Sequence, residues 1–78
     1  MIKNSIYKPT KKKNPDFSEK ELVVVRLICQ EYSNREIAGK MRLSKRTVEG
    51  YRVQILEKMR ARNTAGIVVY ALRNEIYR

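Results

Sequence analysis

A helix-start motif that occurs three times constrains the fold of this chain more than any other feature. Each copy has an apolar residue, then a serine, then another apolar residue four positions after the serine, as in FSEKEL at residues 17–22. The copies at Ser18 and Ser33 also carry a glutamate three residues after the serine, which completes a capping box, whereas the copy at Ser44 has Thr47 there. Each cap stabilises a helix by about 1 kcal/mol. Three such starts in so short a chain predict an all-helical fold.

The caps also predict the helix boundaries. We expect helices at residues 19–31, 34–41 and 45–60, and a fourth at 64–76 that is capped by Asn63. Only Arg42 and Leu43 separate the second helix from the serine cap of the third, which suits two helices that cross steeply, as in a helix-turn-helix. The predicted fold class is all-α, a four-helix bundle containing a helix-turn-helix.

The first sixteen residues differ from the rest of the chain. They contain two prolines and the lysine run 11–13 and show no helical periodicity, so residues 1–16 are predicted to form a flexible basic leader before a domain at 17–78. The whole chain has 18 Lys and Arg against 8 Asp and Glu, a net charge of +10. Charge of this density favours an anionic partner, with nucleic acid as the leading candidate and a merely solvated charged surface as the alternative.

The chain lacks the residues that several functional classes need. The chain has no histidine, no cluster of metal ligands and no nucleophile beside a base, so we expect neither an enzyme nor a metal or cofactor site. Cys29 is the only cysteine, in an apolar stretch that predicts a buried small hydrophobe. No apolar run approaches the roughly 20 residues that span a bilayer. These features predict a cytoplasmic protein that does not bind membranes.

The predicted third helix, 45–60, has two faces of different character. On a helical wheel Val48 and the apolar residues near it face inward, and the opposite side is mostly polar. The second helix of a helix-turn-helix lies in the major groove, with its N-terminal residues on the base edges. The residues of the outward face there, which we predict to read bases, are Arg46, Glu49, Gly50 and Val53.

Each of these four residues has a chemically defined role and a simpler alternative. Arg46 could clamp a guanine or a phosphate, Glu49 could accept from a cytosine amino group, and Val53 could contact a thymine methyl. Gly50 lowers helix stability by roughly 1 kcal/mol relative to alanine, which close approach to DNA would explain. Alternatively, Glu49 only pairs with a neighbouring basic residue, and Gly50 is a tolerated glycine without a role.

A second set of residues has the donors and charges that hold DNA phosphates. They lie at the two helix starts and along the third helix, where amides, hydroxyls and cations would meet the backbone. Contacts of this kind position a protein on DNA but carry no sequence information. The predicted backbone set is Ser33, Asn34, Arg35, Lys45, Thr47, Arg52, Lys58 and Arg60.

The predicted fourth helix, 64–76, is apolar around most of its circumference. One domain core cannot cover so broad a surface, so this helix should be buried on two sides. Val69, Leu72 and Ile76 form the predicted partner-facing set of a two-fold dimer on DNA. The alternative is that the N-terminal leader folds over this surface.

The ordered set of motifs resembles the LuxR/GerE-type helix-turn-helix, the output domain of response regulators of the NarL/FixJ type. The resemblance covers residues 17–77, about four-fifths of the chain. Its carrying segments are residues 18–21, 33–38, 43–48, 55–59 and 62–64, which read SEKE, SNREIA, LSKRTV, ILEKM and RNT.

The resemblance implies sequence-specific binding of double-stranded DNA in bacterial transcription regulation, with a third helix that enters the major groove and a fourth that forms a dimer interface. Family positions that contact bases fall on Glu49, Gly50 and Val53. The family usually has histidine where Tyr51 stands, and basic residues often occupy the positions of Glu49 and Val53, so the operator sequence stays open. RNA polymerase is a further candidate partner. The competing hypotheses are an RNA-binding module and a polymerase-interacting helical module.

Overall fold

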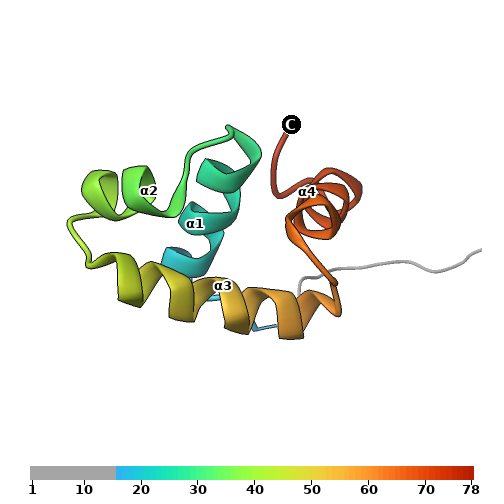
Figure 1. The fold of residues 1–78 in the computed structure, drawn as a ribbon. Coiled ribbons are helices and arrows are strands. Elements are labelled where there is room, and N and C mark those ends of the chain that lie inside the picture. Colours follow the sequence, from blue (N-terminus) through green and yellow to red (C-terminus); the bar gives the residue numbers. More distant parts are fainter. Residues whose placement is uncertain (1–15) are drawn as a thin grey trace, which may run out of the picture.

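Four helices follow one another in the computed structural model, which describes residues 16–78. Their bounds are α1 Glu19–Cys29, α2 Asn34–Met41, α3 Lys45–Met59 and α4 Thr64–Arg73. Helix α3 runs along one side of the molecule, and α2, α1 and α4 lie beside one another along it (Figure 1). The described residues contain no strand, and the predicted all-α class is confirmed. The predicted flexible leader lies outside the described residues, apart from Asp16.

All four helices begin at the predicted caps. The Ser18 hydroxyl accepts from the Glu21 amide at 3.1 Å, and the Glu21 carboxylate accepts from the Ser18 amide at 2.8 Å. Ser33 and Glu36 form the same reciprocal pair. At the start of α3 the Ser44 hydroxyl caps the Thr47 amide, and at the start of α4 the Asn63 side chain caps the Gly66 amide. Side-chain oxygens thus satisfy amides that a helix terminus leaves without partners.

Three helices end earlier than the sequence predicts. Helix α1 ends at Cys29 instead of 31, α3 at Met59 instead of 60, and α4 at Arg73 instead of 76. A residue with positive φ stands just after the last turn of each helix, and none of them is a glycine: Glu31, Arg42, Arg60 and Glu75. The left-handed conformation turns the chain out of the helix at these positions.

The hydrophobic core lies where α1 meets the other three helices. Helix α1 contacts α2, α3 and α4, and its residues Val24 and Val25 are fully buried. Ile37 of α2, Ile55 of α3 and Ile67 of α4 are also fully buried and complete the centre of this core. The β-branched run at 23–25 therefore forms helix because tertiary packing outweighs its preference for strand.

The position of Ile76 corrects one sequence-based prediction. Its side chain is only 8% exposed and belongs to the core, so it is not available to a second protomer. The physical reason is the early end of α4. The chain reverses at Glu75, where φ is 58°, and the Ile76 amide donates to the Ala71 carbonyl at 2.9 Å, which places Ile76 against its own domain.

Candidate nucleic-acid interface

The turn between α2 and α3 sets the orientation of α3. Arg42 adopts the left-handed conformation, and the Leu43 amide then donates to the Ala38 carbonyl at 2.9 Å. Leu43 packs against the core, and Ser44 begins α3 at once. This short turn holds α2 across the N-terminal part of α3, as Figure 1 shows.

Helix α3 has one buried face and one face in solvent. Val48, Ile55 and Met59 are buried against the other helices. The four residues predicted to read bases, on the opposite side, are all exposed: Arg46, Glu49, Gly50 and Val53. The fold therefore gathers them on one accessible surface, which we call the reading face.

The surroundings of Glu49 and Gly50 bear on the simpler alternatives. The Glu49 carboxylate lies 3.9 Å from Lys45 Nζ, so the neighbouring pair does form, but the two side chains are 50% and 63% exposed. An exposed pair at this distance contributes little stability and leaves the carboxylate accessible. A Cβ added to Gly50 would meet nothing within 4 Å. Packing within the domain therefore does not explain the glycine.

The predicted backbone set occupies several elements around the reading face. On α3, Lys45 and Thr47 are exposed, and so is its C-terminal cap residue Arg60. At the start of α2, Ser33 and Arg35 are also exposed. The Ser33 amide and hydroxyl hydrogen-bond to Glu36 and hold the pKa of that carboxyl below its ordinary value. Glu36 therefore stays ionised, and the Ser33 hydroxyl is already engaged as a cap. Asn34 is half-buried.

Arg52 has a partner that the sequence does not suggest. Its guanidinium donates to the Thr64 hydroxyl, at the first residue of α4. The two residues are twelve positions apart, and no local pattern links them. This contact joins the middle of α3 to the start of α4 and limits the freedom of the Arg52 side chain, which is half-buried.

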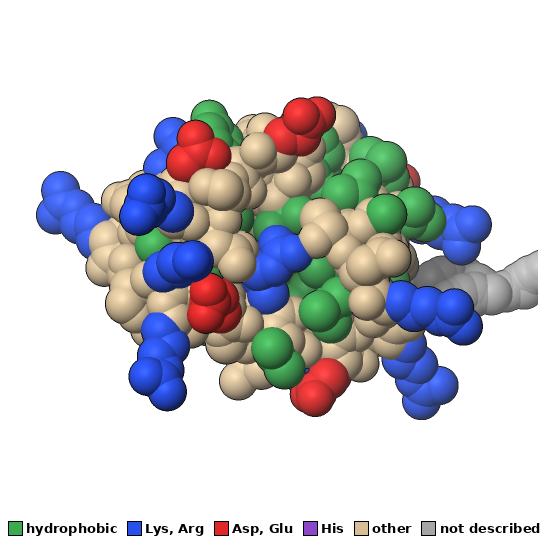
Figure 2. Space-filling model, in the orientation of Figure 1, with side chains coloured by type: hydrophobic (Ala, Val, Ile, Leu, Met, Phe, Trp, Pro, Cys, Tyr) green, Lys and Arg blue, Asp and Glu red, His purple; other side chains and the backbone are tan. Residues whose placement is uncertain are grey.

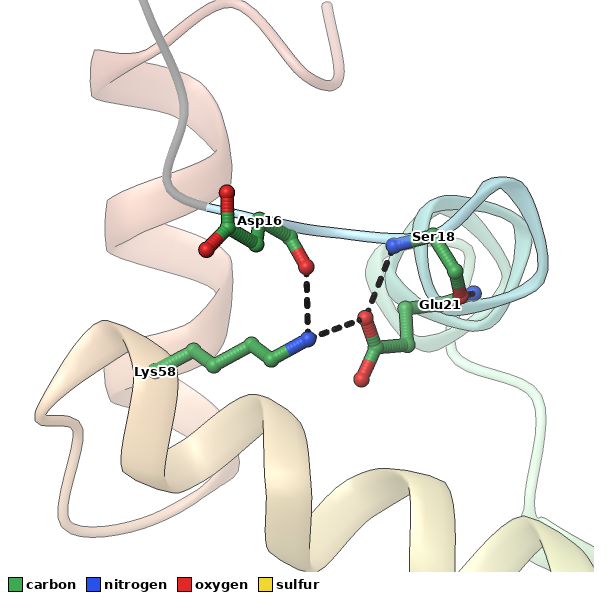
Figure 3. A network of polar contacts seen from close by, with 4 residues as sticks. All are labelled: Asp16, Ser18, Glu21 and Lys58. Atoms are coloured by element: carbon green, nitrogen blue, oxygen red, sulfur yellow. Dashed lines mark hydrogen bonds and ion pairs between the residues drawn. The ribbon is translucent and has the colours of Figure 1, made fainter.

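Lys58, which the sequence assigns to the backbone set, has partners within the fold. Its Nζ lies 2.7 Å from the Glu21 carboxylate and 2.6 Å from the Asp16 carbonyl (Figure 3). The Glu21 side chain is only 3% exposed and the Lys58 side chain 34%. Lys58 is turned toward the start of α1, so its charge serves an internal ion pair that the sequence pattern missed.

The pKa of Glu21 reflects two opposed effects. Burial of the carboxylate raises its pKa, but the Lys58 hydrogen bond and charge and the Ser18 hydrogen bonds outweigh that and bring the pKa below its ordinary value of 4.5. Among the described residues, Oε2 of Glu21 accepts no hydrogen bond. Glu21 is therefore an ionised carboxylate inside the fold, and its charge depends on Lys58.

Positive charge is spread over the surface around these elements. Figure 2 shows Lys and Arg side chains projecting at the end where α2 and the start of α3 lie, and again at the opposite end near the α3–α4 turn. Within residues 16–78 no group of His, Cys, Asp and Glu could hold a metal ion, and no helix is long and apolar enough to cross a membrane. Cations thus cluster at both ends of the face shown in Figure 2, with exposed carboxylates such as Glu49 between them.

Comparison with known families decides the class of the domain. The family of bacterial regulatory proteins known as the luxR family matches residues 15–71, more than half of the chain. The chain belongs to the LuxR family. The matched region contains the turn between α2 and α3, the reading face and most of α4. LuxR-family helix-turn-helix domains are DNA-binding units of transcription regulators, which agrees with the architecture described above.

Individual relatives place the LuxR-family domain within longer proteins. The oxygen regulatory protein NreC of Staphylococcus carnosus is 36% identical over 59 residues, which cover 76% of this chain and 27% of NreC. The virulence-factor regulator BvgA of Bordetella pertussis is 37% identical over 59 residues, which cover 76% of this chain and 28% of BvgA. The chain thus spans about a quarter of the length of these relatives.

Proposed function

We propose that this LuxR-family domain binds specific double-stranded DNA sequences with α3 in the major groove. The observation that carries the proposal is the reading face. Arg46, Glu49, Gly50 and Val53 all lie exposed on the side of α3 opposite its buried residues. In a helix-turn-helix this is the side that meets base edges.

Each residue of the reading face has a distinct task in this proposal. Arg46 donates to guanine or to a phosphate, and Glu49 accepts from a cytosine amino group after the weak contact with Lys45 is given up. Val53 contacts a thymine methyl. Gly50 allows the helix backbone to come close to the DNA, because nothing of the domain itself occupies the space beside it.

The backbone set positions the domain without reading sequence. The start of α2, with Ser33, Asn34 and Arg35, presents helix amides and a cation to one phosphate strand. Lys45, Thr47 and Arg52 of α3 lie beside the reading face, and Arg60 lies at its far end. Lys58 is omitted, since its ammonium group is held by Glu21.

Helix α4 supports a two-fold dimer on DNA. Val69 and Leu72 are 46% and 52% exposed, although both are apolar. We call these two residues the pairing face. A symmetric pair would present two copies of α3 to an inverted repeat whose half-sites are about 10 base pairs apart. The pairing face is small, so dimers are expected on DNA rather than in dilute solution.

The relatives suggest the process in which this DNA binding takes part. The names of NreC and BvgA describe regulators, and this chain corresponds to about a quarter of each. We place the chain in the same role, as the DNA-binding part of a regulator that controls transcription. RNA polymerase stays a candidate partner of the DNA-bound form.

Selection of bound sequences from a random duplex pool tests the proposal. The expected result is an inverted-repeat consensus, bound by two protomers. Leu72→Glu should abolish cooperative binding to that repeat and leave binding to a single half-site unchanged, because Leu72 lies away from the reading face. Recovery of no consensus contradicts sequence-specific binding, and one protomer per repeat contradicts the dimer.

A further inference from the structure

An open hollow of about 570 Å³ lies between the α3–α4 turn and the outer side of α4. Its lining includes Met59, Ala61 and Tyr70 and three arginines, Arg60, Arg62 and Arg73. Val69 of the pairing face also lines it, so the hollow borders the proposed dimer surface. No Asp or Glu lines it. The hollow is therefore suited to an anion and not to a cation.

The charges of these arginines are not neutralised within the fold. The ion pairs of residues 16–78 are Lys45–Glu49, Lys58–Glu21 and Arg78–Glu75, none of which involves the three arginines. Residues 1–15 contain no Asp or Glu in their sequence, so they bring no carboxylate to the hollow.

The hollow also has a defined place relative to the reading face. Arg46 and Val53 are seven residues apart, so they follow one stripe along α3, and Arg60 is the cap residue that directly follows the helix. At 1.5 Å per residue, Arg60 lies about 21 Å from Arg46 along the helix axis. The major groove is only about 12 Å wide. If α3 lies across the groove when its N-terminal part reads bases, its C-terminal end extends beyond the groove's width, toward the phosphate backbone that borders it.

We infer that this hollow is a second phosphate-binding site, in which Arg60, Arg62 and Arg73 hold the DNA backbone beyond the base-reading part of α3. Its ligand is a phosphodiester, recognised by guanidinium groups that donate in pairs. Arg62 and Arg73 thereby join the backbone contacts, and Arg60 connects the two sites. The inference rests on the proposed function, because it requires α3 to lie in the major groove.

The salt dependence of DNA binding tests this inference with the full 78-residue chain. Affinity for a mixed-sequence duplex and for the selected inverted repeat is measured over a range of NaCl concentrations. Arg62→Gln and Arg73→Gln should each reduce the slope of log affinity against log salt by about 0.9 for each phosphate that is no longer neutralised, equally on both duplexes. Arg62→Lys, which keeps the charge, should retain most of the slope.

The matched control is Arg78→Gln. Arg78 is an exposed arginine paired with Glu75 and does not line the hollow, so its loss changes the net charge equally but should leave the slope unchanged. Circular dichroism verifies that each variant folds. Unchanged slopes for Arg62→Gln and Arg73→Gln, or an equal reduction for Arg78→Gln, overturn the inference. If the unchanged chain binds neither duplex, the proposed function itself fails, which separates the two results.

Discussion

The two ends of α3 carry ion pairs of the same type, lysine with glutamate, in opposite surroundings. At the N-terminal end Lys45 and Glu49 are 3.9 Å apart and largely exposed. At the C-terminal end Lys58 and Glu21 are 2.7 Å apart, and the carboxylate is almost fully buried. The first pair lies within one helix and the second joins two. An ion pair thus joins α3 to α1 at one end and the other end of α3 stays exposed.

The largest effect is expected from Val48→Asp, because Val48 packs in the core at the N-terminal end of α3. Val48 is fully buried beneath the reading face. An aspartate there would bury a charge without a partner, which should destabilise the domain by more than about 4 kcal/mol. Loss of the helical circular dichroism signal measures this. A folded Val48→Asp chain would show that the N-terminal end of α3 is not part of the core.

Lys58→Met should cause the next largest loss of stability. It leaves the Glu21 carboxylate buried without its cation, and breaking a buried pair destabilises proteins by about 3 to 5 kcal/mol. The Lys58 side chain is 34% exposed, so we expect about 2 to 3 kcal/mol in urea unfolding.

Two variants sharpen this comparison of the pairs. Lys45→Met, which breaks the exposed pair, should change the unfolding free energy by less than about 0.5 kcal/mol. Glu21→Leu combined with Lys58→Met should recover part of the loss, because no buried charge then remains while the capping bond to the Ser18 amide is lost. Equal losses for Lys45→Met and Lys58→Met would remove the difference between the two ends.

Glu49→Ala should change which DNA sequence is preferred, with about 1 to 3 kcal/mol of discrimination for each base contact. Selection from a random duplex pool measures it. Glu57→Ala is the matched control, since it removes another exposed carboxylate from α3 nearer its fixed end. That variant should leave the consensus unchanged. The same consensus for Glu49→Ala as for the unchanged chain would contradict base reading by Glu49.

Acid should weaken the domain through the buried pair. The pKa of Glu21 is lower in the folded chain than its ordinary value of 4.5, so the unfolded chain takes up the proton first as the pH falls. The stabilising contribution is present above that value and is lost as the pH drops through the folded-state pKa. Urea unfolding across this range should show a smaller acid dependence for Glu21→Gln. An identical dependence would mean that Glu21 is not the group responsible.

The smallest effect is expected from Lys45→Ala. This exposed lysine lies beside a phosphate in the proposed complex, so its loss should weaken all duplexes alike and reduce the salt slope by about 0.9. Lys20→Ala, on the exposed side of α1, is the control. A changed consensus for Lys45→Ala would show that Lys45 contacts bases and does not only contact the phosphate backbone.

The starts of the helices could be predicted from sequence because their signals are local. A serine or asparagine and the residue three positions later form the cap, and both are visible in the chain. The outward face of α3 followed from helical periodicity in the same way.

The helix ends were harder to predict from sequence because the glycine that usually follows a helix is missing. Glu31, Arg42, Arg60 and Glu75 adopt positive φ without being glycines, so nothing in the sequence marks the turns. Because α4 ends early, Ile76 lies in the core. A helical wheel that extends the helix through residue 76 could not predict this.

Long-range polar contacts were also beyond the sequence pattern. Lys58 and Glu21 are 37 residues apart, and Arg52 and Thr64 twelve. On a helical wheel Lys58 is simply another surface lysine, and only the packing of α1 against α3 brings a carboxylate to it. Helical periodicity therefore identified the exposed side of α3, but it did not identify which cations form ion pairs within the fold.

The contacts at Asp16 have a mechanical consequence. The chain that enters the domain is attached to α3 through the Asp16 carbonyl and Lys58, and to α1 through Ser18 and Glu21 (Figure 3). A pulling force on the segment before Asp16 would be borne first by these contacts and by the C-terminal end of α3. The N-terminal end of α3, about 18 Å from Lys58 along the helix at Arg46, would feel that load only after they yield. The attachment thus separates tension in the incoming chain from the exposed N-terminal end of α3.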